Sequence, residues 1–346
     1  MIGKLVETEF VKMFRSKELN FNFSKVTGYT VTWGKTFEDD PDWSPYGPMI
    51  LDIEVTDICK GPGGAICPWC YKSNTANNKN NMSFETFKNI IDKLPKYNGI
   101  HFTNQLAIGC DAQCESNPDI WKMMDYSRSV GIIPNVTVAD ISDEVADKLV
   151  KYVGACSCSV YSNKKYGYDS VKKLVDRGMK QCNIHKLVSL ESLDEIYELF
   201  NDYLNGEERL KGLNAIVLLS LKQKGRGKHF TRLPQEDFSK LVNYALDNGI
   251  PIGFDSCGCH KLLESVKERD NYKELEMLSE PCESAIFSQY INVLGNFYPC
   301  SFTENGNGIN VEKCDDFLKD VWYNISTVNF RNKLLENNRN CFEFNI

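Results

Sequence analysis

Three cysteines in one glycine-rich stretch, Cys59, Cys67 and Cys70, are the residues of this chain most suited to chemistry. They follow the apolar run 49–55, which has the length and β-branched content of a buried strand, so we expect the thiols just beyond its C-terminal end. Three thiolates meeting at one point suit an iron–sulfur cluster, which normally takes four cysteines. The missing fourth ligand would leave one iron open to bind another molecule.

A structural zinc site is the main alternative for this stretch. Structural zinc takes four ligands, usually as two close pairs. Cys67 and Cys70 form the only C-x-x-C pair in the chain, and the four histidines are scattered. Inert buried cysteines are a second alternative, but a loop that carries three glycines is a poor place to bury thiols. The sequence therefore favours a cluster.

Other cysteines gather toward the C-terminus. Five of the fourteen lie between positions 257 and 314, and a sixth lies near the end. They are Cys257, Cys259, Cys282, Cys300, Cys314 and Cys341. We therefore predict a smaller α+β domain built around metal at residues 257–346, with helical signals near 261–278 and a hairpin that turns at Gly295.

The segments that must position the first cysteines alternate between two patterns. Strand-like segments lie at 50–55, 100–108, 133–138, 155–161, 182–188 and 213–219, and helix-like segments at 83–94, 118–130, 142–152, 167–177 and 192–204. A further helix at 234–248 leads to a strand at 250–255. This alternation predicts parallel βαβ units, and so an α/β fold of the partial (β/α)6 TIM-like barrel type. Active sites of such barrels lie at the C-terminal ends of the strands, where the cysteine loop is expected.

The domain organisation that follows has three parts. Residues 1–48 form an N-terminal extension with a short helix, a strand at 29–33 and a turn-rich linker at 39–48. Residues 49–256 form the barrel, and residues 257–346 form the C-terminal domain.

Composition limits the cellular setting and the partners. The 346 residues include no apolar run long enough for a membrane span and no signal-peptide pattern, so we expect a cytoplasmic protein whose cysteines bind metal. The net charge is −7 and no long basic stripe is present, so nucleic acid is an improbable partner. One basic cluster keeps that option open: Lys222, Lys224, Arg226, Lys228 and Arg232.

Two motifs together resemble the radical S-adenosylmethionine (SAM) superfamily, specifically members with a C-terminal SPASM or Twitch auxiliary-cluster domain. The first is a strand followed by a three-cysteine loop that ends in C-x-aromatic-C, with Trp69 as the aromatic residue. The second is Cys282, twelve residues, Gly295, four residues and Cys300, similar to the C-x(9–15)-G-x4-C signature of the auxiliary domain. Trp322 and the later Phe330-Arg331 pair also resemble residues that close such domains.

The resemblance implies a mechanism and its cofactors. Cys59, Cys67 and Cys70 would hold a [4Fe–4S] cluster whose fourth iron binds the amino and carboxylate groups of SAM. One-electron reduction would cleave SAM to a 5′-deoxyadenosyl radical, which abstracts a substrate hydrogen. Such an enzyme needs an electron donor such as flavodoxin or ferredoxin.

Three departures from the family pattern stand out. The cysteine spacing is C-x7-C-x2-C instead of the commoner C-x3-C-x2-C, although glycines permit the tight turns that a longer loop needs. The Gly-Gly-Glu motif that binds the methionine amino group is replaced by residues 111–114, so Gln113 would accept from the ammonium without full charge. The cysteine block for a second auxiliary cluster is absent, so we expect one auxiliary [4Fe–4S] cluster.

Candidate ligands follow from the same resemblance. The auxiliary cluster would take Cys257, Cys282, Cys300 and Cys341, with Cys259 as the alternative to Cys257 and Cys314 in reserve. Residues expected to contact SAM or substrate are Trp69, Gln113, Ser159, Tyr161, Lys164, Asn183 and His185.

Each of these roles has a structural alternative. Trp69 could be a packing aromatic, His185 a core histidine and Lys164 a solvated surface residue. Cys110 and Cys114 flank Gln113 and are candidates to donate a hydrogen atom or an electron to a substrate radical, or else are buried structural cysteines. Cys156 and Cys158 are expected on the opposite face of their strand from Ser159.

Three functions remain open. Relatives with this domain pairing often modify peptides by crosslinking, epimerisation or oxidation, so a peptide or protein substrate ranks first. A small-molecule radical dehydrogenase with one auxiliary cluster ranks second. A non-catalytic iron–sulfur or zinc protein, acting as a redox or binding module, is the third.

Overall fold

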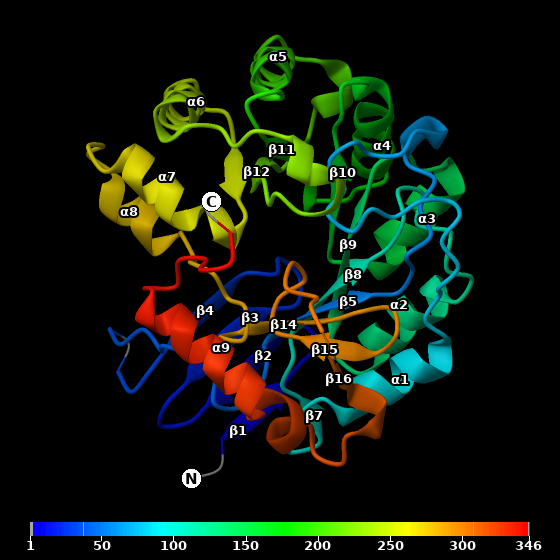
Figure 1. Ribbon diagram of the computed structural model, residues 1–346, viewed down its shortest axis with the longest axis vertical. Coiled ribbons are helices and arrows are strands. Elements are labelled where there is room, and N and C mark those ends of the chain that lie inside the picture. Colours follow the sequence, from blue (N-terminus) through cyan, green and yellow to red (C-terminus); the bar gives the residue numbers. More distant parts are fainter. Residues whose placement is uncertain (1–2, 37, 307, 345) are drawn as a thin grey trace.

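A ten-stranded sheet forms the framework of the computed structural model, which describes residues 3–36, 38–306, 308–344 and 346 (Figure 1). Seven of its strands are parallel and neighbour one another in chain order. They are β5 (Ile50–Glu54), β8 (Gln105–Gly109), β9 (Ile133–Val138), β10 (Ala155–Ser159), β11 (Cys182–Val188), β12 (Ala215–Ser220) and β13 (Ile252–Phe254). The predicted α/β class with a parallel sheet is thus confirmed.

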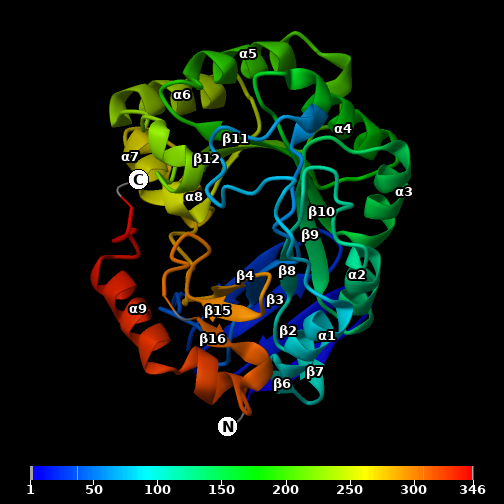
Figure 2. The ribbon, with the colours of Figure 1, turned by 45° about the vertical axis from the view of Figure 1, so that its right-hand side comes forward.

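Helices cover the outer side of this sheet and follow one another in an arc around it (Figures 1 and 2). They are α1 (Phe84–Lys93), α2 (Ile120–Ser129), α3 (Asp143–Tyr152), α4 (Lys164–Asp176), α5 (Leu193–Leu204) and α6 (Gln235–Asp247). Local sequence explains their starts: the side chains of Ser83 and Ser142 accept hydrogen bonds from the backbone N–H groups of Thr86 and Val145. The βα alternation predicted from sequence is therefore present, with one helix after each strand.

The two faces of the parallel sheet differ in chemistry. On β5, Leu51 and Ile53 are buried in the main hydrophobic core, whereas Asp52 and Glu54 line a cavity. The same alternation holds on β11, where Ile184 is buried and His185 lines the cavity. Successive side chains of a strand point to opposite faces, so the outer face packs against helices and the inner face encloses a polar space.

One predicted strand is divided. The segment 100–108 contains β7 (Ile100–His101), which pairs with β6 (Lys96–Tyr97), and then β8, which begins at Gln105. Asn98 and Gly99 both have positive φ, at 55° and 77°, as a tight Asn-Gly hairpin turn requires. The Asn-Gly pair was the sequence signal for this turn.

The N-terminal extension is an antiparallel sheet, so the predicted short helix is wrong. Its strands are β1 (Lys4–Glu7), β2 (Val11–Arg15), β3 (Asn20–Ser24) and β4 (Thr30–Trp33), and β4 confirms the predicted strand. Phe21 and Phe23 alternate with polar residues and are fully buried, which is the period of a strand and not of a helix. Phe14 and Phe21 pack against Phe102, with ring centroids 4.9 and 5.5 Å apart.

The C-terminal part adds strands to the main sheet on the other side of β5, and helices precede and follow these strands. These elements are α7 (Cys259–Val266), α8 (Tyr272–Met277), β14 (Ser288–Ile291), β15 (Asn296–Tyr298), β16 (Ile309–Asn310) and α9 (Ile325–Glu336). Strand β14 is parallel to β5, and β15 and β16 follow as antiparallel strands. Gly295 turns the hairpin between β14 and β15 with a φ of 73°, as predicted. The boundaries at 48 and 256 stay predictions.

The motif residue Arg331 holds α9 against the preceding chain. Its guanidinium donates to the carbonyl oxygens of Ala285 (2.6 Å) and Trp322 (3.0 Å) and lies over the rings of Trp43 and Trp322. Since Arg331 is only 2% exposed, these contacts replace its hydration. The Trp and Phe-Arg motif thus has a structural role here.

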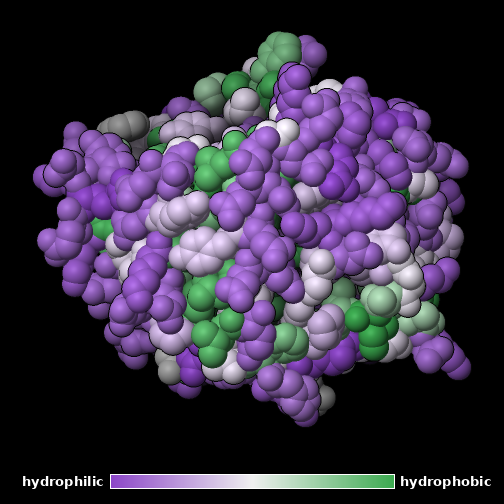
Figure 3. Space-filling model, turned by 90° about the horizontal axis from the view of Figure 1, so that it is seen from above, coloured by the Kyte–Doolittle hydropathy of each residue, from purple (hydrophilic) through white to green (hydrophobic). Residues whose placement is uncertain are grey.

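The surface seen from above in Figure 3 is mostly hydrophilic, with smaller groups of hydrophobic side chains. Across the described ranges, no helix is long and apolar enough to cross a membrane.

Candidate functional site

A cavity of about 700 Å³ lies on the inner face of the sheet. Side chains from β5, β9, β10 and β11 line its wall. The loop that follows β5 brings Cys59, Cys67 and Cys70 to it, and the C-terminal part contributes Cys257 and Cys300. Its volume lies within the range of roughly 300–1,000 Å³ typical of ligand pockets. Both cysteine groups that the sequence singled out therefore border one cavity.

Glycine conformation shapes the three-cysteine loop. Gly61 has a φ of 72°, and a Cβ there would lie 1.9 Å from the carbonyl oxygen of Ala65. The chain then makes a 3-10 turn at Pro62–Gly64 before it reaches Cys67. These glycines explain how a seven-residue spacer still returns Cys67 to the side of Cys59.

Arg226 fixes the far end of the same loop. Its Nε donates to the carbonyl oxygen of Cys67 (2.8 Å), and a second guanidinium nitrogen donates to that of Asn74 (3.0 Å). The backbone N–H of Arg226 donates to the carbonyl oxygen of Cys70 (3.0 Å). Arg226, one residue of the basic cluster seen in the sequence, thus binds the backbone of the cysteine loop.

The three thiols influence one another electrostatically. Burial raises the pKa of Cys59, and it raises the pKa of Cys67 to about 11, with the charges of the neighbouring cysteines acting in the same direction. A hydrogen bond with Tyr161 and the charge of Arg226 act the other way on Cys67. The buried surroundings therefore favour the neutral thiol forms of Cys59 and Cys67.

No three Cys, His, Asp or Glu side chains in the described part of the chain are placed to hold a single metal ion. The ligands of one tetrahedral zinc lie about 3.8 Å apart when the Zn–S distance is about 2.3 Å. A cubane cluster is larger than one ion and separates its cysteines further.

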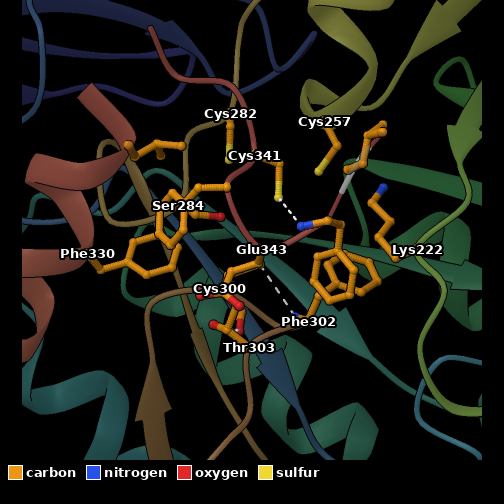
Figure 4. A pocket seen from close by; sticks show the side chains of 14 residues that line it. Lys222, Cys257, Cys282, Ser284, Cys300, Phe302, Thr303, Phe330, Cys341 and Glu343 are labelled. Atoms are coloured by element: carbon orange, nitrogen blue, oxygen red, sulfur yellow. Dashed lines mark hydrogen bonds between the residues drawn. The ribbon is translucent and has the colours of Figure 1, made fainter. Parts of the chain in front are cut away.

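Four cysteines from four segments line a second, narrow cavity beside the first (Figure 4). They are Cys257, Cys282, Cys300 and Cys341. The backbone N–H groups of Phe302 and Phe344 donate to the sulfurs of Cys300 (3.4 Å) and Cys341 (3.3 Å). The structure thus brings together the same four cysteines that the sequence analysis selected, although metal ligation by them stays a prediction.

The two reserve cysteines lie elsewhere. Cys259 is the first residue of α7 and is buried in that helix, and Cys314 donates its thiol to the carbonyl oxygen of Asn310 (3.3 Å). Neither lines the four-cysteine cavity. Cys257 lies in the 3-10 turn at Ser256–Gly258 that precedes α7, and this position places it in the cavity lining.

Four of the residues expected to contact SAM or substrate line the large cavity: Trp69, Ser159, Tyr161 and His185. The rings of Trp69 and Tyr161 lie 5.3 Å apart. The Nδ1 atom of His185 lies 3.3 Å from the hydroxyl oxygen of Thr137. Burial lowers the pKa of His185 to about 4, so the imidazole is neutral at pH 7 and able to accept a hydrogen bond.

Gln113 lies against the three-cysteine loop. Its Nε2 donates to the carbonyl oxygen of Gly61 (3.0 Å), while its Oε1 is buried and accepts no hydrogen bond from any described residue. Buried acceptors without a partner are rare because each costs about 1–3 kcal/mol. Its neighbours Asp111 and Ala112 line the cavity, whereas Gln113 itself does not.

Besides Gln113, three predicted residues do not line the cavity. Lys164 begins α4 and pairs on the outer side with Asp202 (2.6 Å) and Glu198, so it is not placed to meet a carboxylate in the cavity. Asn183 accepts a hydrogen bond from Asn214 (2.8 Å) instead of lining the cavity.

Cys114 is the third of these residues. It is fully buried in the core behind Cys110, and only Cys110 lines the cavity. Cys156 and Cys158 are fully buried, while Ser157 and Ser159 line the cavity from the other face of β10, as expected.

Sequence reasoning missed the charged residues of the cavity. Asp52 and Glu54 occupy alternate positions of a run that reads as an apolar strand. The Nζ atom of Lys72 lies 3.2 Å from the Oε2 atom of Glu54, and the hydroxyl of Tyr290 donates to the same carboxylate (3.1 Å). Burial raises the pKa of Asp52 to about 7. The signal was the spacing of two acidic residues within the strand.

No protein-family model matches the chain, and a search among curated proteins found no match. Among solved structures, BtrN in complex with AdoMet and 2-DOIA is similar over 83% of this chain and 87% of its own, at 14% identity and a TM-score of 0.43. The FeFe-hydrogenase maturase HydG from Carboxydothermus hydrogenoformans is similar over 84% and 67%, at 12% identity and 0.43. The radical SAM enzyme HemN from Escherichia coli is similar over 60% and 54%, at 12% identity and 0.42. These TM-scores are low, and what this chain does is therefore inferred from its own residues.

Proposed function

We propose that this protein is a radical SAM enzyme with one auxiliary cluster. The observation that carries the proposal is the shared cavity: a three-cysteine loop at the C-terminal end of β5 borders one side of it, and two members of a four-cysteine group border another. Three soft donors in one loop suit a cluster with an open iron, and four suit a closed one.

The residues present fit both cofactors. Cys59, Cys67 and Cys70 would hold the first [4Fe–4S] cluster, and the unpartnered Oε1 of Gln113 would accept from the ammonium of SAM. Together, the cluster and SAM supply a 5′-deoxyadenosyl radical that takes a hydrogen atom from the substrate. The auxiliary [4Fe–4S] cluster would be held by the four-cysteine group.

The chain's own residues would orient the substrate and exclude water from the cavity. We rank a peptide or protein side chain first as the substrate. A small-molecule alcohol or amine is the second candidate, favoured by the hydroxyl and carboxyl groups of Ser157, Ser159 and Asp52 on the cavity wall. Either substrate is to be identified by mass spectrometry after co-incubation with candidate compounds or co-expressed peptides.

Cleavage of SAM tests the proposal directly. Protein reconstituted anaerobically with iron and sulfide should form 5′-deoxyadenosine from SAM only when a strong reductant is added, as measured by liquid chromatography with mass spectrometry. Protein that retains iron yet forms no 5′-deoxyadenosine would instead support the redox or binding module.

Gln113 gives a second, narrower prediction. Replacing it with leucine should weaken SAM binding about tenfold, since a hydrogen bond to a charged group contributes about 1.5 kcal/mol. Equilibrium dialysis of the reconstituted protein with radiolabelled SAM measures the dissociation constant. Gln235→Leu is the control and should bind as the wild type does, because Gln235 lies at the start of α6 and donates to Ser239 and Ser265 instead of to the three-cysteine loop. Equal affinity in both variants would remove Gln113 from the SAM site.

A further inference from the structure

Lys222 is a buried cation between the two cysteine groups. It follows β12, is 6% exposed and lines both the large cavity and the four-cysteine cavity, where it lies near Cys257 (Figure 4). Its ammonium pairs with Asp255 and lies 4.9 Å from the ring centroid of Phe302. A lysine so deeply buried is uncommon unless its charge has partners.

The geometry around Lys222 suits a charged ammonium. The ammonium forms an ion pair with the carboxylate of Asp255 and faces the ring of Phe302, and both contacts stabilise a cation in a buried site. Lys222 lines the same narrow cavity as Cys257, Cys282, Cys300 and Cys341, so one positive charge borders the four-cysteine group.

Asp255 holds this arrangement in place. Its carboxylate accepts from the hydroxyl of Ser220 (2.9 Å) and from the backbone N–H groups of Ser220 (3.2 Å) and Gly258 (3.2 Å). It therefore fixes both the end of β12 that leads to Lys222 and the turn that carries Cys257. The positions of the cation and the sulfur are coupled through one carboxylate.

We propose that Lys222 raises the reduction potential of the cluster bound by Cys257, Cys282, Cys300 and Cys341. The potential of an iron–sulfur cluster depends on net charge and on hydrogen bonds to its sulfurs. One-electron reduction adds a negative charge, so a neighbouring ammonium stabilises the reduced state more than the oxidised one. This inference rests on the proposed function, because it requires the auxiliary cluster.

A potentiometric titration followed by electron paramagnetic resonance tests it in the full-length reconstituted protein. The auxiliary signal is the one that addition of SAM leaves unchanged. Lys222→Met, which keeps the length of the side chain without its charge, should reduce the equilibrium constant for reduction about tenfold, a shift of about 59 mV for a one-electron couple. Lys222→Arg should lie close to the wild type.

The matched control is Lys186→Met. Lys186 is 2% exposed and pairs with Glu195, but it lines neither cavity, so its loss should leave the potential unchanged. Should Lys222→Met bind less iron, Lys222→Gln provides the same comparison with a neutral donor. A Lys222 variant with full iron content and an unshifted potential would overturn the inference. Wild-type protein with iron at only one cysteine group would overturn the auxiliary cluster itself, which is a distinguishable result.

Discussion

Replacing Cys67 with alanine should abolish reductant-dependent formation of 5′-deoxyadenosine. With two thiolates left, the cluster would lose one of its three protein ligands, and bound iron should fall from about eight to about four per chain if both clusters are [4Fe–4S]. The backbone of the loop should persist, because Arg226 binds the carbonyl oxygen of Cys67 and not its thiol. Iron analysis and product analysis on the same preparation measure both effects.

Cys156→Ala is the matched control for this variant. Cys156 is fully buried on the opposite face of β10 from the cavity, so its loss should cost some stability and leave iron content and 5′-deoxyadenosine formation near wild type. Full activity in Cys67→Ala would refute the three-cysteine site. Activity lost in Cys156→Ala with all its iron bound would show that the assay responds to general damage.

Most of the α/β framework was predictable because its signals are local. The helices that cover the parallel sheet repeat an apolar face, and Ser83 and Ser142 mark two helix starts that the structure retains. Strands β1, β2 and β3 were missed because they are short and their alternation, as at Phe21 and Phe23, is weak against a background of polar residues. The stability of the N-terminal sheet comes from contacts with Phe102, far away in the sequence, which no local pattern reports.

The three-cysteine site could be predicted because the spacing of its residues in the sequence largely determines it. Cys59, Cys67 and Cys70 lie in one loop, so their convergence follows from the strand before them and the glycines between them. The prediction that Lys164 contacts SAM or substrate could not be made reliably from the sequence, because the first residue of a helix can point inward or outward. Here Asp202 on the neighbouring helix α5 determines its direction. Asp52 escaped notice because a strand of a parallel sheet is expected to be apolar on both faces, whereas this sheet encloses a cavity.

The C-terminal cysteine group leads to the second large effect. Cys300→Ala should reduce bound iron from about eight to about four per chain, while the SAM-sensitive signal of the first cluster remains. Cys300 borders both cavities, so its loss should open the four-cysteine site without touching the three-cysteine loop. Reductive cleavage of SAM should therefore continue, while turnover of the substrate falls to background. Iron analysis, electron paramagnetic resonance and product analysis measure the three effects.

Two other cysteines provide controls of the same chemistry. Cys259 is two residues from Cys257, and Cys314 is buried near β16, yet neither lines the four-cysteine cavity. Cys259→Ala and Cys314→Ala should therefore keep all the iron, and Cys257→Ala should lose it as Cys300→Ala does. If Cys259→Ala loses iron and Cys257→Ala keeps it, then Cys259 is the fourth ligand and the assignment to Cys257 is wrong. Cys257 and Cys259 are only two residues apart in the sequence. A difference in iron content between these two variants would therefore reflect where each side chain lies relative to the cavity.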